Sequence, residues 1–382
     1  MGSRRLARFL LLNSLYFSSV ALWRTMLPLY LDYRGLDPWE VGLAYSLAVT
    51  LPMVVSVAAG ALVDRAGWRL SLAASALIIG TGSFALTYAS DLVSSLSLIL
   101  ILSFSIALFT QAGVEIVALS SESGERGFAY SLYYLSIGAS TALGSSLSGF
   151  VVELAGYGIL FAASSILAIL AAPLALGAGE GRRERRGEWL ESLECVAGEP
   201  TLVLLSAVLA IHEFSVFVCV PYIALFAKKV LEFGEPSIGL LFGVSNLAYL
   251  VSQPLAGKLA DKIGGSSTLL LHLVATSLFY AALPFVKGYP EALLLFAYDG
   301  FTVSLDLPAR KKLTADYAPS GRVALTSGVL DTLAGTAALP SPLLGGSIWE
   351  KMGASYVMYA GGILNLLTLL PMLVLKSRER SS

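Results

Sequence analysis

Six ionisable residues interrupt long apolar stretches of this 382-residue sequence. They are Arg24, Glu115, Glu213, Asp299, Asp306 and Asp331. Placing a charge at the centre of a lipid bilayer costs at least about 2.5–3.5 kcal/mol on insertion scales, so a charge retained there predicts a function. Burial also favours the neutral form of a carboxylic acid, which can then exchange protons as its surroundings change. These residues therefore predict proton exchange and binding of charged ligands in an apolar setting.

Arg24 and Glu213 form the most specific pair of candidates. Aligning Pro28 with Pro221 puts Val20 in the place of Glu213 and predicts that Arg24 and Glu213 lie on related faces of two helices. We expect Glu213 to titrate and Arg24 to hold an anionic group or to tune Glu213. Two alternatives remain: the two residues form a structural ion pair, or Arg24 extends to the outer lipid headgroups.

Asp299 and Asp306 are seven residues apart, which places both on one helix face at two depths. Either carboxylate could exchange protons. Pro308 follows closely, and a kink there would free a backbone carbonyl for substrate or water. The alternative is hydrogen bonding to neighbouring helices or pairing with the basic cluster at 310–312. Asp331 allows the same two interpretations.

Glu115 and His212 are weaker candidates. Glu115 forms a polar pair with Gln111 one helical turn away, and it could simply meet water at the floor of a cavity. His212 precedes Glu213 but points about 100° away on a helix, which is more typical of a packing residue than of a proton carrier. We expect His272 to be structural.

Composition places the chain in a membrane. Hydrophobic residues make up 56% of the chain and charged residues only 13%, against about 25% charged in soluble domains. The net charge of −1 gives no reason to expect a nucleic-acid partner. Cys195 and Cys219 cannot form a disulfide framework. Motifs for zinc hydrolysis, nucleotide binding and serine nucleophiles are missing, so we expect no enzyme, metal or cofactor.

Charged stretches and stretches rich in Pro and Gly separate the apolar segments of the chain. Each segment is near the length of about 20 residues that one membrane crossing needs. Backbone groups in lipid must be paired within the segment, so the segments are expected to be helices. The twelve predicted spans lie near 7–31, 39–63, 69–90, 93–119, 126–152, 157–177, 200–227, 237–260, 267–286, 291–313, 322–347 and 354–375. The sequence thus predicts an all-α membrane protein of two six-helix bundles, residues 1–177 and 200–382, joined by a cytoplasmic linker at 178–199.

The distribution of Lys and Arg predicts the orientation. With a cytoplasmic N-terminus, nineteen of the twenty-five basic residues fall on the inner side. These nineteen are Arg4, Arg5, Arg8, Arg65, Arg69, Arg126, Arg182, Arg183, Arg185, Arg186, Lys258, Lys262, Arg310, Lys311, Lys312, Arg322, Lys376, Arg378 and Arg380. Five lie outside and Arg24 lies within a span. We expect both termini in the cytoplasm of a prokaryotic cell, with the chain in its plasma membrane.

An internal repeat links the two halves. GALVDRAGWR begins at Gly60 and GKLADKIGG begins at Gly257, an offset of 197 residues. The matched pairs are Gly60 with Gly257, Asp64 with Asp261, Arg65 with Lys262, and Gly67 with Gly264. Further matches are Gly42 with Gly239, Arg126 with Arg322, and the small-residue stripe of Thr141, Ser145 and Gly149 with Ala337, Ser341 and Gly345. Such stripes allow backbones to approach closely, so we expect helices five and eleven at a tight interface between the two halves.

These features resemble the major facilitator superfamily over the whole chain. The resemblance implies that the two turns, with Arg69, Arg126 and Arg322, act as conformational latches, in which Asp64 faces a helix N-terminus of the opposite half. Two family signatures are missing. Phe109 stands where the helix-four signature has an arginine, and the antiporter motif of helix five has its nearest likeness at Pro342, in helix eleven.

The residues and the resemblance together predict a secondary transporter working by alternating access. Embedded acids outnumber the embedded base, which favours proton-coupled efflux of a cationic or amphiphilic small molecule. One alternative is proton-coupled uptake of a small polar or anionic solute held by Arg24. Another is a membrane sensor or scaffold without transport. The expected partners are the substrate, protons and membrane lipids, with the proton gradient as energy source and the chain as a monomer.

Overall fold

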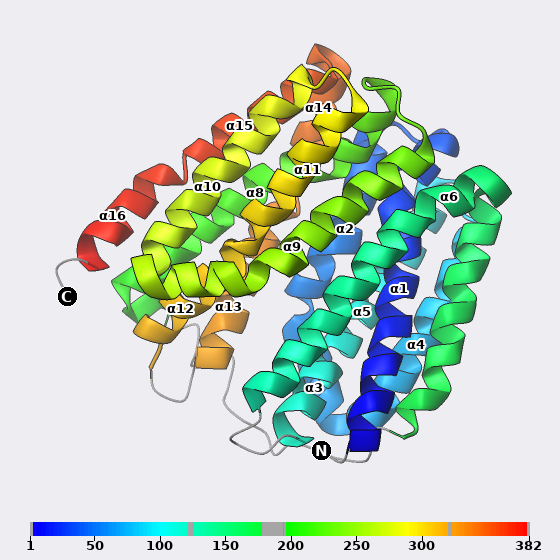
Figure 1. Ribbon diagram of the computed structural model, residues 1–382, viewed down its shortest axis with the longest axis horizontal. Coiled ribbons are helices and arrows are strands. Elements are labelled where there is room, and N and C mark those ends of the chain that lie inside the picture. The colour runs from blue at the N-terminus through cyan, green and yellow to red at the C-terminus, as the bar shows by residue number, and fades with distance from the viewer. Residues whose placement is uncertain (1–2, 121–125, 178–193, 195, 320–322, 380–382) are drawn as a thin grey trace. The chain divides into compact units, whose positions relative to one another are not determined.

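The structure is a computed structural model that describes residues 3–120, 126–177, 194, 196–319 and 323–379 (Figure 1). Every regular element among these residues is a helix. The predicted all-α class is therefore confirmed. Most of the predicted linker and Arg322 lie outside the described residues.

The first half of the chain forms six labelled helices. They are α1 (Ser3–Tyr33), α2 (Pro38–Val54), α3 (Ser56–Ala66), α4 (Trp68–Leu86), α5 (Leu92–Ser120) and α6 (Arg126–Ala175). Helices α2 and α3 meet at a bend of 56° and together are long and apolar enough for one membrane span. Helix α6 is broken at Gly156, where φ is 78° and ψ is 172°, so it consists of two arms.

The second half contains more breaks. Its helices are α8 (Pro200–Lys229), α9 (Glu235–Ile263), α10 (Gly265–Ala282), η1 (Leu283–Phe285), α11 (Tyr289–Ser304), α12 (Asp306–Tyr317), α13 (Val323–Ala338), α14 (Ser341–Met352), α15 (Ala354–Leu366) and α16 (Leu369–Glu379). In the described part of the chain, eight helices, or nine with the bent pair, are long and apolar enough to cross a membrane. The helices occupy the segments of the predicted spans, so the twelve-span pattern is consistent with the structure.

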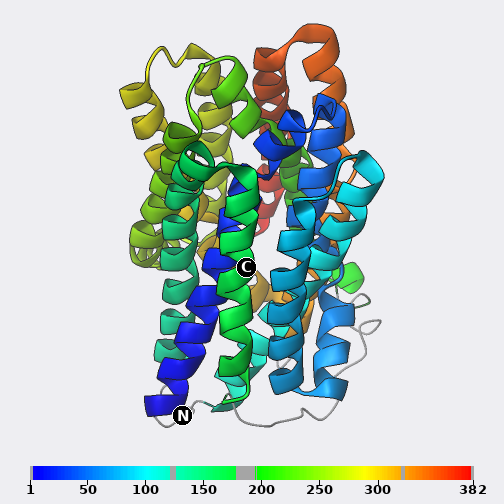
Figure 2. The ribbon, with the colours of Figure 1, turned by 90° about the vertical axis from the view of Figure 1, so that its right-hand side faces the viewer.

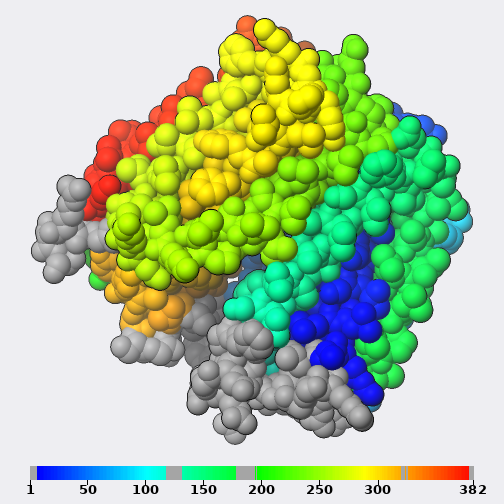
Figure 3. All heavy atoms as spheres, in the orientation of Figure 1, coloured from blue at the N-terminus to red at the C-terminus, as the bar shows by residue number. Residues whose placement is uncertain are grey.

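The helices group into two compact units. Unit 1 comprises Met1–Leu36, Leu47–Arg186 and Phe233–Asn246, and unit 2 comprises Asp37–Ser46, Gly187–Glu232 and Leu247–Ser382. The start of α2 thus packs within unit 2, and the start of α9 packs within unit 1. In unit 1, α1 lies between the two arms of α6, blue between teal and green in Figures 2 and 3.

The backbone carries the repeat that the sequence predicts. The described residues with positive φ form three pairs, each separated by 197 residues: Gly35 with Glu232, Gly67 with Gly264, and Gly156 with Gly353. At Gly67 and Gly264 the angles are nearly equal, with φ of 80° and 89° and ψ of 152° and 156°. Glycine enters this left-handed region without a steric cost, so it ends one helix and redirects the chain into the next.

Glycines also bring helices into close contact at repeat-related places. In unit 1, a Cβ at Gly149 on α6 would collide with the backbone of Glu235 on α9. In unit 2, a Cβ at Gly346 on α14 would collide with Trp39 on α2. The tight interfaces expected for helices five and eleven are thus present, with α9 and α2 as their respective partners. The contacts match Gly149 with Gly346, one residue beyond the predicted match with Gly345.

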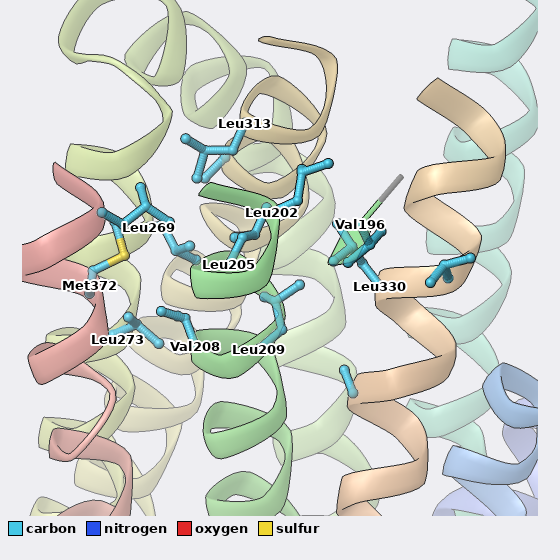
Figure 4. Close-up of a cluster of buried hydrophobic side chains, with 14 residues drawn as sticks. Val196, Leu202, Leu205, Val208, Leu209, Leu269, Leu273, Leu313, Leu330 and Met372 are labelled. Carbon is cyan, nitrogen blue, oxygen red and sulfur yellow. The ribbon is translucent and has the colours of Figure 1, made fainter. Parts of the chain in front are cut away.

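A hydrophobic core holds unit 2 together around α8 (Figure 4). It is built from leucine, valine, alanine and methionine side chains of α8, α10, α12, α13 and α16. Leu205, Leu269 and Leu313 are at most 1% exposed. This core packs α8, α10 and α12 together, and these three helices also carry the charged residues and the histidines described below.

The glycine contacts predict a stability difference between two single methyl additions. Gly149→Ala is expected to lower the thermal unfolding midpoint in detergent, because overpacking costs about 1–3 kcal/mol. Gly328→Ala in α13 is the matched control, since a Cβ there meets no atom within 4 Å. Equal midpoints for the two variants would contradict the close approach of α6 and α9.

Candidate functional site

A buried cluster of three charged side chains lies inside unit 2. The guanidinium of Arg310 on α12 donates to Glu213 Oε1 on α8 at 2.5 Å and to Asp306 Oδ1 at 2.6 Å. Arg310 and Glu213 are only 8% and 9% exposed, and the Asp306 side chain is 19% exposed. We call Glu213, Asp306 and Arg310 the charge cluster.

A break in the helix positions Asp306 and Arg310. Pro308 has no N–H to bond the carbonyl of Ser304, and the helix is interrupted at Leu305, between α11 and α12. The helix is thus interrupted close to Pro308, and α11 and α12 still form one candidate membrane span from Tyr289 to Tyr317. Asp306 lies in the first turn of α12, where a carboxylate is stabilised by the helix dipole, and Arg310 follows one turn later on the same face.

Two histidines adjoin the charge cluster. His212 on α8 and His272 on α10 are 4% and 2% exposed. Their Nε2 atoms are 3.2 Å apart, and His272 Nε2 lies 3.9 Å from Asp306 Oδ1. On the other side of each ring, Nδ1 of His212 lies 2.8 Å from Asn365 Oδ1, and Nδ1 of His272 lies 2.8 Å from the carbonyl oxygen of Thr302.

The charges of this group do not cancel. Two carboxylates face one guanidinium, so the charge cluster carries a net charge of −1 while both histidines are neutral. Because charges are costly to bury, the surplus favours uptake of one positive charge, such as a proton. Histidines with a carboxylate also occur in transition-metal sites. Here the nearest carboxylate oxygen already accepts from Arg310, and a divalent ion would reverse the imbalance rather than remove it.

The structure brings some of the predicted site residues together and leaves others apart. Gathered in the group are Glu213, Asp306 and His212. Asp331 on α13 pairs with Lys311 at 3.7 Å and is partly exposed. Asp299 lies partly buried on α11. Asp306 pairs with Arg310 of the basic cluster at 310–312, and whether it also exchanges protons stays a prediction.

Two members of the group were assigned differently from the sequence. We counted Arg310 among the basic residues of the inner side, and the structure buries its side chain in an ion pair with Glu213 of α8. We expected His272 to be structural, whereas it contacts both His212 and Asp306. The spacing of Asp306 and Arg310, four residues apart, was a signal for an ion pair on one helix face.

Unit 1 places aromatic rings where unit 2 has the charge cluster. The offset of 197 residues puts Tyr16 in the place of Glu213 and Phe109 in the place of Asp306. The rings of Tyr16 and Phe109 stack with centroids 3.6 Å apart, and both are fully buried. This offset replaces the match of Glu213 with Val20, and the stacking explains why an aromatic residue suits position 109.

The other two candidates of unit 1 lie on α1 and α5. Arg24 is partly buried on α1. Glu115 is 7% exposed on α5. Arg24 and Glu213 belong to different units, and the ion-pair partner of Glu213 within its own unit is Arg310. The predicted cooperation of Arg24 with Glu213 stays a prediction.

The latch candidates occupy equivalent helix ends. Asp64 and Arg65 lie in the last turn of α3, Gly67 ends that helix, and Arg69 stands in the first turn of α4. In the second copy, Asp261 and Lys262 end α9 ahead of Gly264. Gly60 and Gly257 lie within α3 and α9, one turn before the acids. Of the two arginines, Arg126 begins α6, and Arg322 lies outside the described residues.

The chain is similar to bacterial relatives along its length. One is the multi-drug resistance efflux pump PmrA homolog of Lactococcus lactis subsp. lactis (strain IL1403), 23% identical over 358 residues, or 91% of this chain and 87% of the relative. Another is multidrug resistance protein MdtG of Dickeya zeae (strain Ech586), 27% identical over 143 residues, or 36% of this chain and 35% of the relative.

Solved structures share the fold at low identity. A POT family transporter in complex with 5-aminolevulinic acid superposes with a TM-score of 0.81 at 13% identity, over 98% of this chain and 96% of that chain. A bacterial homolog of the human lysosomal transporter Spinster gives a TM-score of 0.76 at 14% identity, over 98% and 95%.

The family profile of the Major Facilitator Superfamily matches residues 9–207 and 202–382. With the helical fold and the repeat already described, this match covers nearly all of the sequence. The chain therefore belongs to the major facilitator superfamily and is a multi-pass membrane transporter rather than an enzyme.

Proposed function

We propose that this transporter expels a cationic or amphiphilic small molecule in exchange for protons. The observation that carries the proposal is the surplus negative charge of Glu213, Asp306 and Arg310, buried inside unit 2. A proton and a cationic substrate can each neutralise that surplus. Binding of one therefore weakens binding of the other, and two ligands that exclude each other at one site are exchanged rather than carried together.

In this proposal, the free-energy cost of an uncompensated charge couples proton movement to substrate movement. With neither cation bound, the charge cluster keeps a net negative charge in a setting of low dielectric constant, which is unfavourable. The change between inward-open and outward-open states is expected to proceed when a proton or a cation is present. Asp306 is the most exposed member of the cluster and is the natural point of access.

The names of the relatives support the direction. The PmrA homolog, which is similar to 91% of this chain, is named as a multidrug efflux pump, and MdtG as a multidrug resistance protein. Efflux of amphiphilic cations fits a site with surplus negative charge. We further propose that both termini face the cytoplasm at the cell membrane, which rests on the distribution of basic residues. When the buried Arg310 is left out of the count, eighteen basic residues lie on the predicted inner side and five on the predicted outer side.

We also propose that Asp64 and Asp261 act in two related latches. Both stand at helix ends that precede a glycine of nearly identical backbone conformation. A carboxylate that meets a helix N-terminus gains about 0.3–1 kcal/mol, which suits a contact made in one transport state and released in the other.

Purified protein in proteoliposomes tests the exchange, with the lipophilic cation ethidium as probe and a pH-sensitive dye inside. We expect an imposed pH gradient to drive ethidium transport, with protons moving in the opposite direction. Ethidium flux that ignores the gradient would contradict proton coupling. Protons moving together with the solute would instead indicate symport, and no flux with any tested cation would indicate a non-transporting scaffold.

Glu213→Gln is expected to abolish gradient-driven accumulation of ethidium, with a loss of at least about tenfold. The reason is that Asp306 and Arg310 then balance each other without a proton. Ethidium binding, measured by fluorescence, is expected to persist in part. The matched control is Glu153→Gln, since Glu153 is exposed on α6. Unchanged accumulation in Glu213→Gln would remove Glu213 from the mechanism.

Asp64→Asn is expected to slow turnover about two- to fivefold. This factor is the change in rate that corresponds to the free energy of a carboxylate at a helix N-terminus. The order of preference among several cationic dyes should stay the same, because a latch acts on the conformational change and not on substrate choice. Initial rates of dye transport measure both. An altered order of preference would argue against the latch role.

A further inference from the structure

The two histidines of unit 2 are the only histidines in the sequence, and the structure places them face to face. Their Nε2 atoms are 3.2 Å apart, on helices α8 and α10. Because the two histidines are 60 positions apart in the sequence, the tertiary fold and not local chain geometry brings them together. Their proton states are set by the partners on the far side of each ring.

The tautomer of His272 follows from Thr302. The carbonyl oxygen of Thr302 lies 2.8 Å from His272 Nδ1. A carbonyl oxygen only accepts hydrogen bonds, so Nδ1 of His272 must carry the hydrogen. In the neutral ring, Nε2 of His272 then holds a lone pair.

The tautomer of His212 follows from Asn365. The amide nitrogen of Asn365 donates to the carbonyl of Leu273 at 2.8 Å and to Ser277 Oγ at 3.0 Å, which fixes the orientation of the amide. The amide oxygen therefore faces His212 Nδ1, at 2.8 Å, and accepts from it. In the neutral ring, Nε2 of His212 also holds a lone pair.

Two lone pairs thus face each other across 3.2 Å when both rings are neutral. This arrangement is repulsive, and both rings are buried away from water that could separate them. A single proton between the two nitrogens turns the same geometry into an N–H···N hydrogen bond. A second proton would place two positive rings in contact.

We propose that His212 and His272 share one proton between their Nε2 atoms, and that this proton is the coupling ion. The inference rests on the proton exchange proposed above and assigns the proton to a specific pair of atoms. One shared proton brings the charge of the two rings and the charge cluster to zero. It lies beside Asp306, whose Oδ1 is 3.9 Å from His272 Nε2.

The charged groups around the pair come from the helices packed against α8 and α10. The charge cluster supplies Glu213 from α8, and Asp306 and Arg310 from α12. The next groups are Asp331 on α13 with its partner Lys311, and Asp299 on α11. Asp306 is partly exposed and its Oδ1 lies 3.9 Å from His272 Nε2, so it is the group that we expect to exchange the proton with the histidines.

Nuclear magnetic resonance of ¹⁵N-histidine reads this pair directly. The full-length protein, purified with a histidine-free tag into lipid nanodiscs, shows only four ring nitrogens. Between about pH 5 and 9 we expect both Nδ1 atoms to stay protonated, while the two Nε2 signals shift together with uptake of one proton. Separate titration of each ring, uptake of two protons, an unprotonated Nδ1, or two rings that stay neutral throughout would each overturn the assignment. A change of the signals on adding a metal chelator would also overturn it, because a bound metal would then occupy the site.

Transport assays add a functional readout. His212→Gln and His272→Gln are each expected to lower the proton flux per transported ethidium at least about tenfold. The control is Thr268→Val, one turn before His272 on α10, where the lost hydroxyl bonds only the backbone of its own turn. If wild-type protein shows no proton flux, the exchange itself fails. If the wild type is coupled and both histidine variants stay coupled, only the shared proton fails.

Discussion

The ion pairs of Arg310 with Glu213 and Asp306 are the interaction on which the rest of this account depends. They join α8 to α12 in the buried part of unit 2, so their cost is offset only while every charge has a partner. Two acids and one base leave one partner missing. The three side chains that join α8 to α12 therefore also carry the surplus charge on which the proposed exchange rests.

The two halves of the chain share their backbone turns, but the side chains at related sequence positions differ in chemistry. Three pairs of positive-φ residues separated by 197 positions show that the turns of one half recur in the other. At the position of the charge cluster, however, unit 1 stacks Tyr16 on Phe109. An aromatic pair at these sequence positions packs without any charge to compensate. The two halves can thus share the turns of the repeat while the charge cluster lies in one of them.

Much of the fold follows from the sequence, and part of the site does too. Apolar segments with few charges predict the helices, Pro308 predicts the break beside Asp306, and the cost of burial selects Glu213 and Asp306. Arg310 was missed because two lysines follow it, which is typical of a cytoplasmic helix end. The contact of His272 with His212 could not be predicted because the two residues are 60 positions apart in the sequence. Contacts between helices that are distant in the sequence decide such roles, and periodicity along one helix does not show them.

The central claim is that one surplus negative charge is shared in turn by a proton and a cationic substrate. It is tested most directly by counting the protons released when purified protein in weakly buffered solution binds ethidium. The account predicts release of about one proton per bound ethidium in the wild type and none in Glu213→Gln, since competition for one charge is reciprocal. Ethidium binding by the wild type without any proton release would contradict it.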